Sequence, residues 1–194
     1  MEAIKEVYVS NMVCPQCVHY IGELLDELAF QKATIALGHI YFDKPISVDQ
    51  LSVLKSKLKA AGFELVTSKQ KILVEQIKAV VIQSIHAKTR LKKTMSVHLE
   101  YVLGVKYSHL SKVFSQSESI TLEQYIILLK IERAKEFISY GELSLLAIAD
   151  KLHYSDLSHF SRQFKKVVGV SPSVYKKEMK YNRQNLDQLI QEGI

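Results

Sequence analysis

Two kinds of residue in this 194-residue sequence have the types and spacing for chemistry, a cysteine pair and a run of basic and hydroxyl side chains. Cys14 and Cys17 stand in the segment NMVCPQCV, at residues 11–18. Two thiolates at this spacing can chelate a soft ion such as Cu(I), or supply half of a tetrahedral Zn(II) site. The same pair could instead cycle between dithiol and disulfide, with Pro45 as a candidate facing proline. His19 is predicted to point away from the pair.

The basic residues belong to the segment GELSLLAIADKLHYSDLSHFSRQFKKVVGVSPSVYKK, at residues 141–177. Ser144 can cap a first helix, and a turn at His153 and Tyr154 leads to a second. The apolar spacing predicts which residues face inward: Leu145, Ile148, Ala149 and Leu152 from the first helix, and Leu157, Phe160, Phe164 and Val167 from the second. This pattern predicts a helix-turn-helix.

The outer side of the second helix carries short polar residues beside cations: Ser158, His159, Arg162, Lys165 and Lys166. Such groups suit base edges and phosphates in a major groove, so duplex DNA is the predicted partner. We expect Arg162 and Ser158 to contact bases, and Lys165 and Lys166 to contact phosphates. The alternative is an ordinary basic surface helix in a small helical domain.

A second helix-turn-helix is predicted upstream, over residues 99–114, with Gly104 at its turn. Its outward residues are Ser108, Ser111 and Lys112, which are further candidates for DNA contact. Residues 121–140 form the predicted connecting helix. Residues 70–87 form a wide apolar helix that is predicted to pack on the helical part, with a dimer seam as the alternative.

Charge divides the chain near residue 68. Residues 1–68 hold 6 lysines against 8 acidic residues, a net of −2, and residues 69–194 hold 20 basic against 12 acidic residues, a net of +8, which together give the total of +6. A basic C-terminal part is the footprint of a domain that neutralises phosphates. Because neither a membrane-spanning run nor a signal-peptide core is found, we expect a cytoplasmic protein without membrane contact.

The N-terminal part alternates between period-two and helical patterns. Strands are predicted around Val7 and Val9, over 33–37, over 40–42 and over 63–66, and helices over 14–28 and 48–61. The order β-α-β-β-α-β is that of the ferredoxin-like arrangement. The predicted fold class is therefore α+β: a ferredoxin-like domain over 1–68, an all-α domain with two helix-turn-helix units over 69–180, and a helical tail over 181–194.

The C-terminal segment resembles the AraC/XylS family of transcription regulators. The residues that carry this resemblance are Ile148 and Ala149, His153 and Tyr154, Phe160, Ser161 and Arg162, Phe164, Lys165 and Lys166, Gly169, Ser171 to Ser173, and Tyr175. His153 stands where the family usually has Gly, and His tolerates positive φ. The resemblance implies two helix-turn-helix units on one long connecting helix, which enter successive major grooves. Glu100 stands where the family usually has a buried Ala, so the resemblance implies that the first unit is distorted or its first helix is reseated, and that it recognises bases more weakly than the second.

The N-terminal part resembles the heavy-metal-associated domain over about residues 3–67. Met12, Cys14, Cys17 and the closing Ala61-Gly62-Phe63 carry this resemblance. Together the two resemblances imply a DNA-binding transcriptional regulator that responds to Cu(I) or Zn(II) at Cys14 and Cys17. The alternative is a metal-handling or thiol-redox protein whose helical half binds another protein. No catalytic constellation is recognised, so we expect no enzyme, and the sequence leaves the oligomeric state open.

Overall fold

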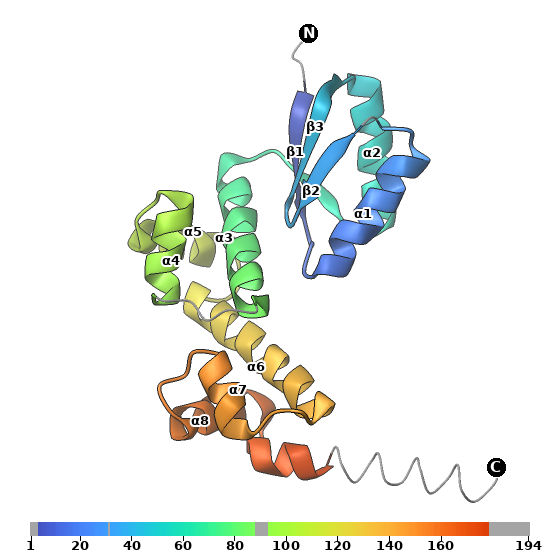
Figure 1. The fold of residues 1–194 in the computed structure, drawn as a ribbon. Helices are drawn as coiled ribbons and strands as arrows, with labels where there is room; N and C mark the ends of the chain where they lie inside the picture. The colour runs from blue at the N-terminus through green and yellow to red at the C-terminus, as the bar shows by residue number, and fades with distance from the viewer. Residues whose placement is uncertain (1–3, 31, 88–92, 179–194) are drawn as a thin grey trace, which may run out of the picture. The chain divides into compact units, whose positions relative to one another are not determined.

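A small antiparallel sheet near the N-terminus is followed by a mostly helical remainder in the computed structural model, which describes residues 4–30, 32–87 and 93–178 (Figure 1). This combination confirms the predicted mixture of a sheet-containing first part and a helical second part. The predicted helical tail over 181–194 lies outside the described residues. Among the described residues, no helix is long and apolar enough to cross a membrane.

The sheet-containing part has the predicted order of elements. They are β1 (Ile4–Ser10), α1 (Pro15–Glu27), β2 (Ala33–Ala36), β3 (His39–Ile46), α2 (Val48–Ala60) and β4 (Glu64–Val66). The strands lie in the order β2-β3-β1-β4, and every pair is antiparallel. Figure 1 shows α1 and α2 together on one face of this sheet.

Local signals explain where the two helices begin. Pro15 occupies the first turn of α1, where its missing N–H would have had no intrahelical partner. Ser47 and Gln50 form a capping box at α2, with a Gln50 N to Ser47 Oγ distance of 3.1 Å and a Ser47 N to Gln50 Oε1 distance of 2.9 Å. After α2, Gly62 adopts φ +85°, which lets the chain turn into β4.

Alternating residues of the central strands form the core of the sheet. The residues that are fully buried here are Val9 of β1, Ile40 and Phe42 of β3, Ile21 of α1, and Leu54 and Leu58 of α2. β3 is longer than the three residues predicted from the sequence, because its pairing continues past Pro45 to Ile46, opposite Ile4. The register of β1 and β3 shifts between Ile4 and Glu6, and such an irregularity tolerates a proline that cannot donate to the ladder.

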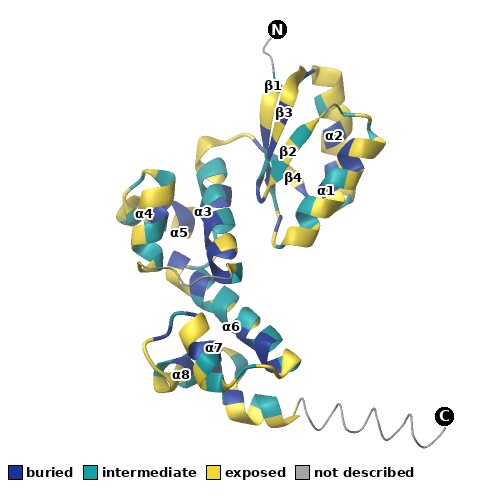
Figure 2. Cartoon of the chain, in the orientation of Figure 1, coloured by how far each residue is buried: buried dark blue, intermediate teal, exposed yellow. Residues whose placement is uncertain are grey.

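The helical part consists of α3 (Lys69–His86), α4 (Met95–Leu103), α5 (Tyr107–Ser117), α6 (Leu122–Tyr140), α7 (Leu145–Lys151) and α8 (Leu157–Val168). The apolar side of α3 is buried within the chain: Val74, Ile77, Val80, Val81, Ile82 and Ile85 are all at most 8% exposed (Figure 2). A dimer seam is therefore not needed to cover this helix. Gln70 Nε2 of α3 lies 3.5 Å from Gln116 Oε1 of α5, so α3 contacts the helical part, as predicted.

The contacts divide the chain into two compact units. One unit comprises Met1–Ser84 with Lys93–Leu122, and the other comprises Ile85–Lys92 with Glu123–Ile194. The division does not fall at residue 68, because α3 packs against the sheet: a Cβ on Gly38, between β2 and β3, would lie 3.5 Å from the carbonyl oxygen of Glu75 in α3. The domain boundary predicted near residue 68 stays a prediction.

Candidate nucleic-acid interface

Helix α8 has one buried aromatic side and one exposed polar side. Phe160 and Phe164 are fully buried, their ring centroids are 5.7 Å apart, and Phe164 is 5.5 Å from the ring of Tyr175. The candidate DNA contacts lie across the helix from these rings: Ser158, Arg162, Lys165 and Lys166 are exposed, and His159 is half-buried. Because the helix is held by its aromatic side, its hydroxyl, guanidinium and ammonium groups are free to meet a ligand.

The ends of α8 are defined by residues that satisfy its terminal backbone groups. Asp156 is the N-cap, and its Oδ1 accepts the backbone N–H of His159 at 2.7 Å. Gly169 ends the helix with φ +90°. Leu157 and Val167, which were predicted to face inward, are 37% and 36% exposed. That prediction was wrong because both residues lie in the terminal turns, beyond the aromatic core that covers the middle of the helix.

The preceding helix and turn match the sequence prediction closely. Ser144 caps α7 by accepting the backbone N–H of Ala147 at 3.1 Å, and Ile148 and Ala149 are buried. His153 adopts φ +61° at the turn, so this non-glycine residue does take the left-handed conformation. The backbone N–H of Tyr154 then bonds the carbonyl of Ala149 at 2.9 Å and closes the turn before α8.

The Tyr154 side chain connects this turn to α6 and to α8, the helix that carries the candidate DNA contacts. Its ring lies 5.3 Å from those of both Phe160 and His159, and the Lys130 ammonium of α6 lies 5.0 Å from its centroid. Burial raises the pKa of Tyr154 to about 12, and burial lowers the pKa of Lys130. The sequence does not indicate this contact of Lys130, because a cation over a ring 24 positions away leaves no local pattern.

The first helix-turn-helix consists of α4 and α5. Gly104 ends α4 with φ +66°, as predicted, and Leu99, Leu110 and Phe114 are fully buried. The candidate contact residues lie on the other side of α5: Ser108 and Lys112 are exposed, and Ser111 is half-buried. These side chains are accessible to a ligand, and their contact with DNA stays a prediction.

Glu100 is accommodated in a way that the sequence did not indicate. Its side chain is exposed, and its Oε1 accepts the backbone N–H of Tyr107 at 2.7 Å, at the start of α5. Glu100 lies on the outer side of α4 and needs no burial. The expected distortion of the first helix-turn-helix, or reseating of its first helix, stays a prediction. The carboxylate supplies a cap that Lys106, the N-cap residue, does not provide.

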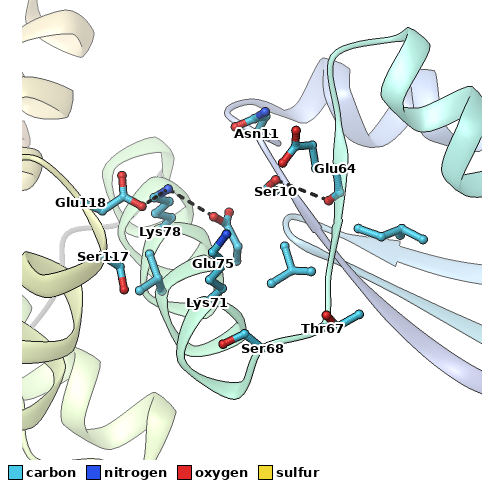
Figure 3. A pocket seen from close by; sticks show the side chains of 13 residues that line it. Ser10, Asn11, Glu64, Thr67, Ser68, Lys71, Glu75, Lys78, Ser117 and Glu118 are labelled. Carbon is cyan, nitrogen blue, oxygen red and sulfur yellow. Dashed lines mark hydrogen bonds and ion pairs between the residues drawn. The ribbon is translucent and has the colours of Figure 1, made fainter.

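A polar cavity of about 390 Å³ lies in the compact unit that contains the sheet, where the ends of β1, β4 and α5 meet α3 (Figure 3). Its wall carries three linked charges. The Lys78 ammonium is 3.2 Å from Glu75 Oε1 and 2.8 Å from Glu118 Oε1. Burial raises the pKa of Glu75, although Lys78 partly opposes this shift. The pKa of Lys78 is raised as well, because the two carboxylates outweigh the effect of its burial.

The two cysteines lie at the start of α1. Cys14 is its N-cap, and the Cys14 Sγ to Cys17 Sγ distance is 3.6 Å. Met12 is a core residue, since it is 4% exposed and its Sδ accepts the backbone N–H of Gly38 at 3.2 Å. The side chain of His19 is 81% exposed and lies 3.4 Å from Glu23, so it points away as predicted. Within the described residues, no third His, Cys, Asp or Glu joins the pair.

Comparison with known proteins places the C-terminal part in a class. Residues 101–178 match a family model described as a helix-turn-helix domain. The Msm operon regulatory protein of Streptococcus mutans serotype c (strain ATCC 700610 / UA159) is 26% identical over 132 residues, which cover 68% of this chain and 46% of that protein. The transcriptional activator NphR of a Rhodococcus species is 23% identical over 160 residues, covering 81% of this chain and 45% of that protein.

A solved structure is similar over part of the chain. The C-terminal domain of the two-component response regulator yesN from Fusobacterium nucleatum subsp. nucleatum ATCC 25586 is 26% identical, with a TM-score of 0.44, and the match covers 56% of this chain and 99% of that one. The chain spans about half the length of the curated relatives named above. Residues 101–178 therefore form a helix-turn-helix domain.

Proposed function

We propose that this chain is a sequence-specific DNA-binding transcriptional regulator rather than an enzyme. The observation that carries the proposal is the two-sided construction of α8, in which buried Phe160 and Phe164 hold the helix and Arg162, Lys165 and Lys166 stand exposed opposite them. The N-terminal residues of such a helix reach base edges, and its flanking cations reach phosphates. The Streptococcus relative is an operon regulatory protein and the Rhodococcus relative is a transcriptional activator, which supports the same class of function.

The residues divide by role within this proposal. Arg162 and Ser158 contact base edges, together with His159 in the first turn of α8. Lys165 and Lys166 contact phosphates. In the first helix-turn-helix, Ser108, Ser111 and Lys112 face the DNA from α5. This helix recognises bases more weakly than α8, because the Glu100 carboxylate occupies its start.

The test of this function is equilibrium binding of the full chain to labelled duplexes selected from a random pool. We expect a preferred sequence, and an affinity that falls steeply as salt rises, because each phosphate contact releases counterions. The quadruple contact variant with alanine at Arg162, Lys165, Lys166 and Lys112 should lose both properties. Salt-independent binding, or no selection of any sequence, would remove the DNA-binding function and favour a helical half that binds protein.

We infer further that the sheet-containing part is a ferredoxin-like domain whose cysteine pair binds a soft metal, Zn(II) or Cu(I). The element order and the strand order β2-β3-β1-β4 support the fold assignment. The 3.6 Å separation of Cys14 Sγ and Cys17 Sγ supports chelation: with Zn–S bonds of about 2.3 Å it gives an S–Zn–S angle of about 100°, close to tetrahedral. Linear Cu(I) coordination would require the sulfurs to move apart.

The rival redox function has less support. Its facing proline would have to be Pro45, but β3 runs antiparallel to β1, with Ile46 opposite Ile4. Cys14 follows the other end of β1, after Ser10, so Pro45 lies at the opposite end of the sheet from the cysteines. The thiol pair therefore lacks the partner that this chemistry uses in thioredoxin-like folds.

Metal binding is tested by titrating the reduced chain with Zn(II) or Cu(I), beside a Cys14→Ser, Cys17→Ser variant. We expect stoichiometric metal on the unsubstituted chain and a change in operator affinity of several-fold to about a hundred-fold, which the serine variant lacks. Equal isotherms for both proteins, with no metal retained, would leave the pair without a sensing role. A response that occurs under oxidation alone would favour the dithiol function.

A further inference from the structure

A chain of hydrogen bonds at the start of α8 runs from Asp156 through Ser155 to the ring of His159. The Ser155 hydroxyl donates to Asp156 Oδ2 at 2.9 Å, and Ser155 Oγ lies 3.2 Å from His159 Nδ1. The other carboxylate oxygen of Asp156, Oδ1, accepts the backbone N–H of His159 at 2.7 Å. Asp156 therefore contacts the backbone of His159 directly and its ring through Ser155. We call this chain of hydrogen bonds the relay.

The protonation state of Asp156 sets the direction of the relay. The backbone N–H of His159 and the Ser155 hydroxyl hold the pKa of Asp156 below its ordinary value, so the carboxylate is ionised at neutral pH and can only accept. The single hydroxyl proton of Ser155 is thus committed to Asp156. Ser155 Oγ can then bond His159 Nδ1 only as an acceptor, which requires the ring proton to be on Nδ1.

The orientation of the ring is fixed by a second contact. The His159 ring meets the Tyr154 ring edge-on, with centroids 5.3 Å apart and an interplanar angle of 86°. Tyr154 is itself 5% exposed and packs on Phe160, so the ring it supports has a rigid base. A neutral imidazole that carries its proton on Nδ1 offers the lone pair of Nε2, and Nε2 has no hydrogen-bond partner among the described residues.

We propose that His159 is a specificity-determining residue that reads an exocyclic amino group of adenine or cytosine, with Ser155 and Asp156 as the positioning residues that fix its tautomer. In the major groove, adenine N6 and cytosine N4 are donors, whereas guanine O6 and thymine O4 are acceptors. A lone pair on Nε2, in the first turn of a helix that lies in the major groove, accepts a hydrogen bond from adenine N6 or cytosine N4 and is repelled by guanine O6 and thymine O4. This inference rests on the DNA-binding function proposed above.

The tautomer can be tested without DNA. Nitrogen chemical shifts of His159 in the full chain should show a protonated Nδ1 and an unprotonated Nε2 at a pH where the ring is neutral. Ser155→Ala removes the acceptor for the Nδ1 proton, and the proton should shift to Nε2 in most molecules. Ser155→Thr retains the hydroxyl and should retain the tautomer. A ring with its proton on Nε2 in the unsubstituted chain would overturn the proposal.

The reading is tested by selection on random duplexes with the unsubstituted chain, His159→Ala, Ser155→Ala and Ser155→Thr. We expect one position at which adenine or cytosine is preferred by about five-fold to twenty-fold. His159→Ala and Ser155→Ala should lose this preference at that position alone, whereas Ser155→Thr should keep it. Replacing the chosen base by its analogue without the amino group should cost the unsubstituted chain the same factor and His159→Ala nothing.

Two results would overturn the proposed base recognition by His159 and leave the DNA-binding function intact. His159→Ala could weaken all sequences equally, which is the behaviour of a phosphate contact, or it could relax a position at which guanine or thymine is preferred. If the unsubstituted chain selects no sequence at all, the regulatory function fails, and the reading fails with it.

Discussion

The carboxylate of Glu100, in the last turns of α4, accepts the backbone N–H of Tyr107 at the start of α5, over 2.7 Å. A helix N-terminus attracts anions through its free N–H groups and its dipole, and phosphate is the usual external ligand of such a position. Here an internal anion already holds it. The contact links the two helices of the first helix-turn-helix, and it places a negative charge at Tyr107, the residue before the proposed DNA contact Ser108.

Glu100→Gln is expected to raise DNA affinity about two-fold to five-fold, because the amide keeps an acceptor for Tyr107 N while removing the charge that repels phosphates. The measurement is titration of a labelled duplex at fixed salt. Glu142→Gln is the matched control, since it removes the same charge from an exposed site in the loop between α6 and α7. An equal gain in both variants would mean that total charge, and not the position of Glu100, sets the effect.

Arg162→Ala is expected to weaken the preferred duplex by about 1–3 kcal/mol and to relax selection at one base pair, because a guanidinium reads guanine through two hydrogen bonds. Lys166→Ala, four residues along the same exposed side, should weaken preferred and random duplexes alike and should reduce the slope of affinity against salt by about one ion. Competition titrations with both duplexes at several salt concentrations separate these outcomes. Equal losses on both duplexes for Arg162→Ala would reassign it as a phosphate contact.

The helices and most helix ends could be predicted from the sequence because local signals define them. Ser144 caps α7, Gly104 ends α4 in the left-handed conformation, and Phe160 and Phe164 repeat at helical spacing, so each element could be placed from its own residues. His153 at φ +61° shows that the turn was predictable even where a less usual residue occupies it.

The rest depended on contacts between residues far apart in the sequence. Lys130 lies over Tyr154, and Gly38 approaches Glu75, and neither relationship leaves a periodic pattern to detect. The Asp156 cap was recognisable in principle, since an acidic residue beside Ser155 at a helix start is a known signal. The relay from that cap to His159 was not, because it depends on which oxygen each donor reaches.

Lys130→Met is expected to stabilise the chain at neutral pH by about 1 kcal/mol, because a half-buried ammonium is exchanged for an apolar side chain of similar length, against a lost cation–π contact of about 0.5–2 kcal/mol. The pKa of Lys130 is lowered by burial, so the penalty is fully present below its folded pKa. It disappears as the pH rises toward the unfolded value of about 10.4.

Thermal melts of the unsubstituted chain and Lys130→Met should therefore differ at pH 7 and converge toward pH 10. Lys165→Met is the control, because the Lys165 side chain is exposed on α8 and its melting temperature should change little at either pH. A Lys130→Met protein that melts below the unsubstituted chain would mean that the contact with Tyr154 contributes more than burial costs.

Lys78→Met is expected to destabilise the chain by about 1–3 kcal/mol, because it leaves the carboxylates of Glu75 and Glu118 without their shared cation. The side chain of Glu75 is 9% exposed, so water cannot replace the lost partner. Lys71→Met, at an exposed residue lining the same cavity, is the control and should be close to neutral.

Acidification provides a second measurement on the same variant. Burial raises the pKa of Glu75, and the loss of Lys78 can only raise it further, so this carboxyl is neutralised at a higher pH in the variant than in the unsubstituted chain. Chemical denaturation at pH 7 and pH 5 should show the cost of Lys78→Met shrinking as the pH falls. A cost that does not depend on pH would assign the effect to packing of the lysine stem.

Asp156→Ala is expected to lower the melting temperature at neutral pH and to loosen the start of α8, because the carboxylate accepts both the His159 backbone N–H and the Ser155 hydroxyl. The backbone bond from His159 is the main reason that the pKa of Asp156 is depressed. A depressed folded pKa means that the contribution is fully present above the unfolded value of about 3.9 and is lost as the pH falls through the folded value. The difference in melting temperature between Asp156→Ala and the unsubstituted chain should therefore be constant from pH 7 to about pH 5 and should disappear below about pH 4.

Asp156→Asn separates charge from capping, since asparagine caps as well as aspartate but does not titrate. Its melting temperature should stay near that of the unsubstituted chain at pH 7 and should lack the acid-dependent step, and the same step in both proteins would assign it to another carboxyl.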